Sequence, residues 1–314
     1  VTLTPITAQS ATLTITGDFS TIGSGVAVND VLQLIPASGS PVLVSVISVN
    51  STTECTVATR RDEAAIAGVA MDVAVPSYVE IGSKQNGNSF TIGKAYRDVT
   101  HDVGTDEHSQ TYSGAYVSGF TVSSTYGEIV TGAFNTMANG YLQENPSMEQ
   151  NIVAAGGTVN PAPTTQSLNA SVDVPVVATA DEGSGVLATE FCIESFEIAL
   201  DNGMDPSNCI GYPAPKNYTL GTAAISITAS VYLADTSYDS LMPGKISQQP
   251  VSMTFSMTNT DGGYAFHMPA VQLTFPDPSS TGQNEQTMLE ATGTAKVGAN
   301  GESSLRIYQL VGDQ

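Results

Sequence analysis

Short runs of alternating hydrophobic and polar residues recur along the chain, separated by turns rich in glycine, proline, asparagine and aspartate. The pattern is cleanest over 224–233, where Ile225, Ile227 and Val231 fall on one face of a strand. A period of two predicts strands, because successive side chains of a strand point to opposite faces. Further strands are predicted over 89–99, 117–126, 129–134, 186–200, 251–257, 264–273, 288–295 and 304–310.

The rest of the chain is organised around the stretch 112–137. Its two β-rich runs meet at Tyr126-Gly127-Glu128, which predicts an antiparallel hairpin. The strand predicted just upstream carries Phe90 and Ile92 on one face. Three strands with one apolar face can nucleate a sandwich, but they leave an edge that another element must cover.

The first 76 residues turn more quickly. Strands are predicted over 12–16 and 29–35, and 42–49 with 54–58 predicts a hairpin whose loop is 50–53. We interpret 1–76 as a separable small β-barrel or sandwich module. Residues 77–314 then form a larger β-sandwich domain.

Three segments depart from simple alternation. Residues 139–185 lose the strand rhythm, which is typical either of an extended arm that gains order on a neighbour or of a disordered crossover. Mixed parity over 191–200 predicts a bulge or burial on both faces. Residues 236–242 predict the one short helix, because they begin with a hydroxyl residue and Pro243-Gly244 follows.

Composition agrees with an all-β fold. The 314 residues are 41% hydrophobic and only 12% charged, with threonine, serine, asparagine and glycine in place of charged residues. The net charge of −21 repels phosphate backbones and excludes sequence-specific DNA binding. No apolar run approaches the roughly 20 residues of a membrane-spanning helix. The first residue, Val1, leaves open whether a leader or other residues precede it.

Cys55, Cys192 and Cys209 are too few for a disulfide scaffold. Cys192 and Cys209 flank an Asp-Asn-Gly turn and could approach each other, but buried thiols are the preferred interpretation. The cysteine usage indicates assembly in a reducing compartment.

Catalytic and metal motifs are missing. The sequence has no Gly-x-Ser-x-Gly elbow, no phosphate-binding glycine loop with lysine and no His-Glu-x-x-His pair. His267 is interpreted as a structural histidine rather than as part of a triad, and Glu194 and Glu197 lie three apart in a strand, on opposite faces. The polar loop 100–111 holds His101 and His108, but its spacing matches no recognised metal site. We therefore predict no enzyme activity, no metal and no cofactor.

Several segments together carry a family resemblance. Ser-Phe-Thr-Ile at 89–92 begins a strand that ends in an aromatic residue and aspartate, and a polar loop follows. Ser-Gly-Ala-Tyr-Val at 113–117 then leads to Glu-Ile-Val-Thr-Gly-Ala-Phe at 128–134, and the pattern continues over 194–204, 234–242 and 265–273. Together they resemble the tail tube proteins of long-tailed, siphovirus-like bacteriophages. The resemblance covers roughly 77–314, and residues 1–76 carry no diagnostic motif.

The resemblance implies a structural virion protein whose hexameric rings stack into a tail tube, an acidic conduit for DNA passage during ejection. The loop 102–109 would reach the next ring, with site residues Asp102, Thr105, Asp106, Glu107 and His108. Glu128 and Glu194 are the candidates for the lumen, where carboxylates would repel the phosphates of DNA. The expected partners are copies of the chain, the tape measure, terminator and distal tail proteins, and DNA in transient passage, with no membrane. Assembly is expected in the host bacterial cytoplasm, followed by incorporation into the phage tail.

Two other protein classes stay open at this point. A carbohydrate-binding or adhesive β-sandwich of a virion or cell surface suits the composition and the 12 tyrosines, and it predicts a monomer that gives a glycan-array signal. A secreted hydrolase predicts an activity that is lost on His267→Ala.

Overall fold

The computed structural model confirms an all-β chain. Among the residues that it describes, strands make up nearly all the regular structure, and helical backbone occurs only at Ile152 and Val153. The described residues are 2–5, 12–16, 26, 30–36, 42–59, 71–74, 76–81, 89–100, 107–144, 152–153, 155–159, 167–170, 176–181, 193–212, 214–219, 221–232, 250–259, 261–274, 276, 287–298 and 303–310.

The N-terminal strands form one antiparallel six-stranded sheet in the order β1-β2-β5-β4-β3-β6. The strands of this sheet are β1 (Thr2–Pro5), β2 (Thr12–Thr16), β3 (Val31–Pro36), β4 (Val42–Ser51), β5 (Glu54–Thr59) and β6 (Met71–Ala74). The structure thus confirms the strands predicted over 12–16 and 29–35 and the hairpin with its loop near 50–53.

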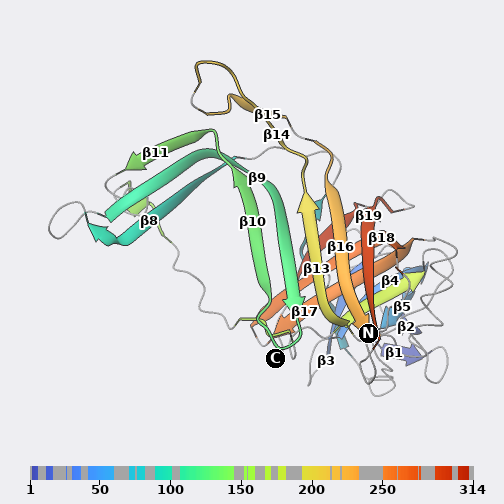
Figure 1. Cartoon of the computed structure of the whole chain (residues 1–314). Coiled ribbons are helices and arrows are strands. Elements are labelled where there is room, and N and C mark those ends of the chain that lie inside the picture. The colour runs from blue at the N-terminus through green and yellow to red at the C-terminus, as the bar shows by residue number, and fades with distance from the viewer. Residues whose placement is uncertain are drawn as a thin grey trace.

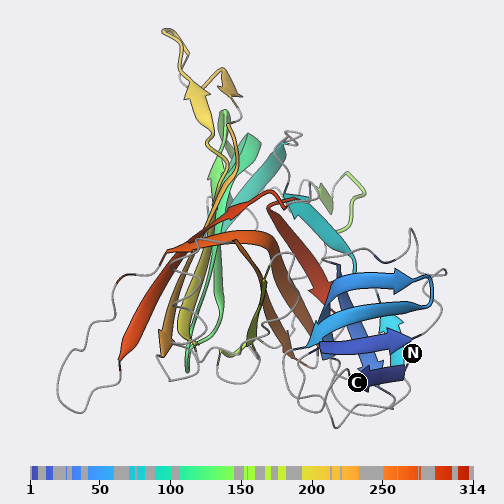
Figure 2. The ribbon, with the colours of Figure 1, turned by 90° about the vertical axis from the view of Figure 1, so that its right-hand side faces the viewer.

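Strand β3 is buried on both faces, and this attaches the N-terminal sheet to the rest of the molecule. Leu32 and Leu34 are buried on one face, in register with β4. On the other face, Val31 packs with a cluster from the large sheet. The other members of that cluster are Ala265, Tyr308 and Leu310. The blue N-terminal strands accordingly lie beside the red C-terminal strand in Figure 2.

The remaining chain builds a 12-stranded sheet whose main path is β10-β9-β13-β16-β19-β18-β17-β12 (Figure 1). Strands β8 and β11 pair with β9, while β20 pairs with both β18 and β7. The strands are β7 (Tyr78–Ile81), β8 (Phe90–Thr100), β9 (Glu107–Thr125), β10 (Thr131–Met137), β11 (Gly140–Glu144), β12 (Val176–Asp181), β13 (Ile193–Asp201), β16 (Ala224–Tyr232), β17 (Val251–Asn259), β18 (Gly262–Thr274), β19 (Met288–Lys296) and β20 (Leu305–Leu310). A separate hairpin consists of β14 (Asp205–Ser207) and β15 (Asn217–Thr219).

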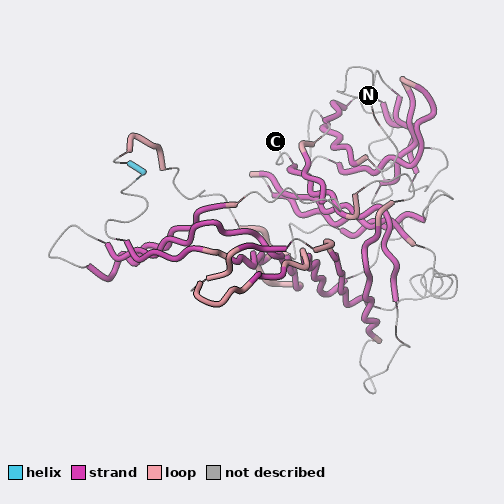
Figure 3. Tube along the Cα trace, turned by 90° about the horizontal axis from the view of Figure 1, so that it is seen from above, coloured by secondary structure: helices cyan, strands magenta, loops and turns pink. Residues whose placement is uncertain are grey.

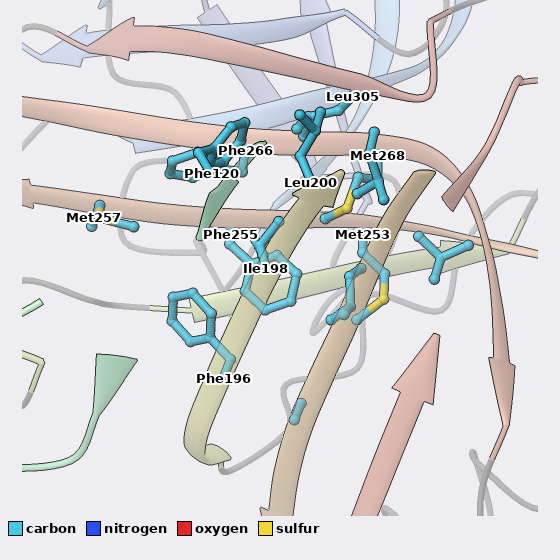
Figure 4. Packing of buried hydrophobic residues seen from close by; sticks show 14 of the residues in the cluster. Phe120, Phe196, Ile198, Leu200, Met253, Phe255, Met257, Phe266, Met268 and Leu305 are labelled. Atoms are coloured by element: carbon cyan, nitrogen blue, oxygen red, sulfur yellow. The ribbon is translucent and has the colours of Figure 1, made fainter. Parts of the chain in front are cut away.

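The large sheet folds over itself into a sandwich with one hydrophobic core. Strands β9, β13 and β16 supply one wall, and β17, β18 and β20 supply the other. Phe196 and Phe255 meet across the interior with ring centroids 4.8 Å apart (Figure 4). Burying such aromatic pairs holds the two walls together, because each ring removes a large apolar area from water.

Two local predictions are confirmed. Strand β13 carries the expected bulge, since its register with β16 shifts between Ile193 and Ser195. Strands β9 and β10 form the expected hairpin, with a turn at Tyr126-Gly127 where Gly127 has φ of 82°. A positive φ costs glycine little, because it has no Cβ.

The described parts of the segment 139–185 include β11 and β12, and Asn169 forms a bridge with Ile129. Leu168 packs against the main core, so the chain returns along the β9–β10 turn. The helix predicted over 236–242 lies outside the described residues.

Candidate assembly surfaces

Strand β10 ends the path of the large sheet. Within the described part of the chain, β10 pairs with β9 and with no second strand. Its side chains are exposed from Thr131 to Thr136, and only that of Met137 is partly buried. The unpaired backbone edge of such a strand can accept a strand from another chain.

The open edge is also apolar. Phe134 is 72% exposed, although its ring lies 6.1 Å from that of buried Phe120. The hydrophobic core therefore reaches the surface beside β10. A large apolar side chain at an open strand edge is characteristic of an interface rather than of a free surface.

The face of β9, β10, β13, β16 and β19 turned away from the core is dominated by small polar residues. Cross-strand partners share a face, so the registers assign its members. Its acids are Glu197, Asp201 and Glu290, and Lys296 is its described base. The remaining members are Gly119, Thr121, Ser123, Thr125, Thr131, Ala133, Asn135, Ser195, Ala199, Ala224, Ser226, Thr228, Ser230, Tyr232, Met288, Thr292 and Thr294. We call this surface the hydroxyl face.

A three-stranded arm extends from the sandwich. Strands β8 and β11 flank the first half of β9, and Figures 1 and 3 show them reaching away from the body. The arm exposes apolar side chains on its surface. They are Phe90, Ile92, Tyr141 and Leu142.

Part of the predicted inter-ring loop belongs to a strand of this arm. Strand β8 continues to Thr100, and β9 already begins at Glu107. Glu107 and His108 therefore belong to a strand, paired opposite Thr100 and Tyr96. The other proposed loop residues, Asp102, Thr105 and Asp106, lie outside the described residues.

The predicted lumen residues Glu128 and Glu194 lie together at one end of the large sheet. Both are exposed, and the Tyr126 amide, in the same turn as Glu128, donates a hydrogen bond to the Glu194 carbonyl at 2.8 Å. The sequence interpretation did not select Glu197 and Asp201, which lie along the hydroxyl face. Their alternation with buried Phe196, Ile198 and Leu200 is the signal that could have identified them.

The surroundings of His267 are those of a buried residue that stabilises the fold. Its ring is fully buried, and Nδ1 lies 2.8 Å from Oγ1 of Thr254 on the paired strand β17. Cys55 is buried as a free thiol, whereas Cys209 is free and exposed, so the expectation of a buried thiol at Cys209 is wrong. Cys192 lies outside the described residues.

The described residues hold neither a metal-binding cluster nor a membrane-spanning helix. No group of three or more histidine, cysteine, aspartate or glutamate side chains there is arranged to hold a metal ion. None of the described helical segments is long and apolar enough to cross a membrane.

The fold and the open edge are those of an all-β protein whose sheet can pair with another chain. The family model for phage tail tube proteins matches residues 4–295, which include the N-terminal sheet as well as most of the sandwich. The chain therefore belongs to the phage tail tube protein family and is a structural component of the virion. Membership also implies assembly with other tail components. No curated protein matches the chain significantly.

Proposed function

We propose that six copies of the chain close into a ring and that stacked rings form the tail tube, a passive conduit for DNA. The open, apolar edge of β10 carries the proposal. In a ring, each copy would add a strand of its large sheet to the β10 edge of its neighbour and would cover Phe134. Cyclic closure would leave none of these edges exposed, which removes the hazard of uncontrolled pairing.

The hydroxyl face is the surface that we assign to the lumen. Its serine and threonine side chains present short, uncharged groups, and its acids outnumber its described base. DNA could slide along such a wall, because few cations are available to form phosphate contacts that must break at each step. Glu128 and Glu194 would add negative charge at the end of this wall, where one ring meets the next.

The arm is assigned to contacts outside the subunit. Its exposed apolar residues need a covering partner. We propose that the segment between β8 and β9, with Asp102, Thr105, Asp106, Glu107 and His108, reaches the next ring. The tape measure, terminator and distal tail proteins are the proposed partners of the completed tube, which would assemble in the host bacterial cytoplasm.

A charge placed at the open edge tests the proposal. Phe134→Asp is expected to leave the subunit folded, because Phe134 is 72% exposed, but to abolish rings. Sedimentation velocity and circular dichroism measure the two effects. Phe134→Leu keeps an apolar edge and should assemble. Tyr264→Asp places the same charge at an exposed position on β18, a strand that is paired on both sides, and should also assemble.

Rings of unchanged size and stability from folded Phe134→Asp would show that β10 is not the ring interface. A wild-type protein that stays monomeric at every protein concentration and salt concentration would exclude ring assembly.

A further inference from the structure

The hairpin of β14 and β15 projects from the end of the large sheet at which β13 finishes (Figures 1 and 2). Its neck is narrow: a Cβ added to Gly221 would lie 2.4 Å from the carbonyl oxygen of Gly203. Above the neck, Tyr218 contacts Tyr116 of β9 with ring centroids 5.5 Å apart. The base of the hairpin is therefore held against the sheet, while its tip is displayed.

The tip is a tight turn that exposes a hydrophobic side chain. The Tyr212 amide donates a hydrogen bond to the Cys209 carbonyl at 3.2 Å, and Gly211 has φ of 91°. These features match a type II turn, with Ile210 at its first central position. Ile210 is fully exposed, and Nζ of Lys216 lies 5.6 Å from the Tyr212 ring centroid. The tip thus combines an apolar group with a cation in a chain that has only 9 basic residues.

The opposite end of the same strands displays the complementary chemistry. Tyr126 and Ile129, at the β9–β10 turn, are exposed apolar side chains. Glu128 and Glu194 are exposed beside them. Strand β13 links the two ends, because it runs from Ser195, opposite Thr125, to Asp201, opposite Gly119.

We propose that the tip of this hairpin docks on the β9–β10 turn of a subunit in the next ring. Ile210 would pack against Tyr126 and Ile129, and Lys216 would lie near the carboxylates of Glu128 and Glu194. The occupant is a second copy of this chain, because one molecule carries both complementary surfaces at opposite ends of its strands. Such a head-to-tail contact is heterologous and propagates without closing, as a tube requires. The inference rests on the proposed ring assembly and names the surfaces by which rings stack.

The exposed thiol of Cys209 allows a direct crosslinking test. Assembled Tyr126→Cys protein is oxidised and separated on a non-reducing gel, with the wild type alongside to measure any background from the native cysteines. The proposal predicts a ladder of covalent multimers that extends beyond six subunits. The ladder should disappear in Cys209→Ser/Tyr126→Cys. It should also be absent from Tyr264→Cys, which places a thiol at an exposed position on β18. A wild-type-like pattern in well-formed Tyr126→Cys tubes would overturn the proposal.

Two substitutions separate stacking from ring formation. Ile210→Asp should leave six-subunit rings intact but raise the critical concentration for tube growth at least about tenfold, since it removes one buried apolar contact. Lys216→Glu should also weaken stacking, and Glu128→Lys/Glu194→Lys should restore it in the same chain. Rings that stack normally with Ile210→Asp would refute the docking while leaving ring assembly standing. Absence of rings from the wild type would instead refute the proposed function.

Discussion

The phenol of Tyr308 lies buried where the two sheets meet, so its protonation is linked to folding. Burial raises the pKa of Tyr308 from 10.0 to about 12, although the nearby Arg306 guanidinium opposes part of the shift. A raised pKa means that the folded state holds the proton more tightly than the unfolded chain does. The associated stability is fully present below pH 10.0 and is lost as the pH rises toward 12.

We expect the free energy of unfolding to fall by about 2–3 kcal/mol across this pH window in the wild type, because of Tyr308. The free energy of unfolding of Tyr308→Phe should not show this part of the decrease. Chemical denaturation at a series of alkaline pH values measures the difference. Equal slopes for the wild type and Tyr308→Phe would show that the phenol is not titrating from a buried site.

Cys55 provides a second alkaline group, located in the N-terminal sheet. Burial, reinforced by the Glu54 carboxylate, raises the pKa of the Cys55 thiol from 9.0 to about 11. Its contribution is present below pH 9.0 and is lost as the pH approaches 11. Cys55→Ala in the Tyr308→Phe background therefore separates the two titrations.

Arg306 links three elements at the contact between the sheets. Its Nη1 lies 3.2 Å from Oδ1 of Asp30, which immediately precedes β3. Its Nε lies 2.9 Å from Oε1 of Glu80 on β7. With only 11% of its side chain exposed, Arg306 is shielded from water that would weaken these ion pairs.

We expect Arg306→Met to lower the free energy of unfolding by about 1–3 kcal/mol, because it removes charged hydrogen bonds but keeps the apolar stem. Guanidinium denaturation measures the change. Lys94→Met, at an exposed lysine of the arm, is the matched control and should have little effect. Equal stability of the Arg306 variant and the wild type would mean that these ion pairs do not hold the sheets together.

These contacts bear on the interpretation of residues 1–76 as a separable module. Rapid alternation in this region correctly predicted strands, and the strands pair among themselves. The pattern could not show that Val31 would be buried against Tyr308 and Leu310, because such contacts join distant parts of the chain. Removal of 1–76 would uncover these side chains. We therefore expect residues 77–314 alone to be less soluble than the full chain.

Local patterns predicted elements better than they predicted strand order or sites. The alternation over 224–233 identified the buried face of β16, and mixed parity identified the bulge in β13. The pairing of β12 with β17 could not be predicted, because it depends on segments far apart in sequence. The β-rich neighbours of Glu128 and Glu194 predict that both carboxylates lie in strands. Whether a carboxylate lies along a strand or at its end depends on turns and bulges, which the neighbours do not reveal.

In the whole tube, the charge of the hydroxyl face should set how easily DNA passes. In particles built from Glu197→Lys/Asp201→Lys subunits, we expect tubes to assemble but genome ejection to slow, because lysines would form phosphate contacts. Raising the ionic strength should reduce the delay by screening this attraction.

The matched control is Glu54→Lys/Asp261→Lys, which makes the same charge change at positions away from the hydroxyl face. Ejection kinetics followed by the release of DNA-bound dye would compare the two sets of particles. Equal ejection rates in particles with intact tubes would exclude Glu197 and Asp201 from the lumen.

Assembly of the tube depends on closure of a ring of identical subunits at β10. Electron cryomicroscopy of the purified wild-type protein would show this edge in the assembled state. We expect rings or tubes with six-fold symmetry, in which density from a neighbouring subunit continues the sheet beyond β10 and covers Phe134. Particles in which the β10 edge and Phe134 remain in contact with solvent would contradict it.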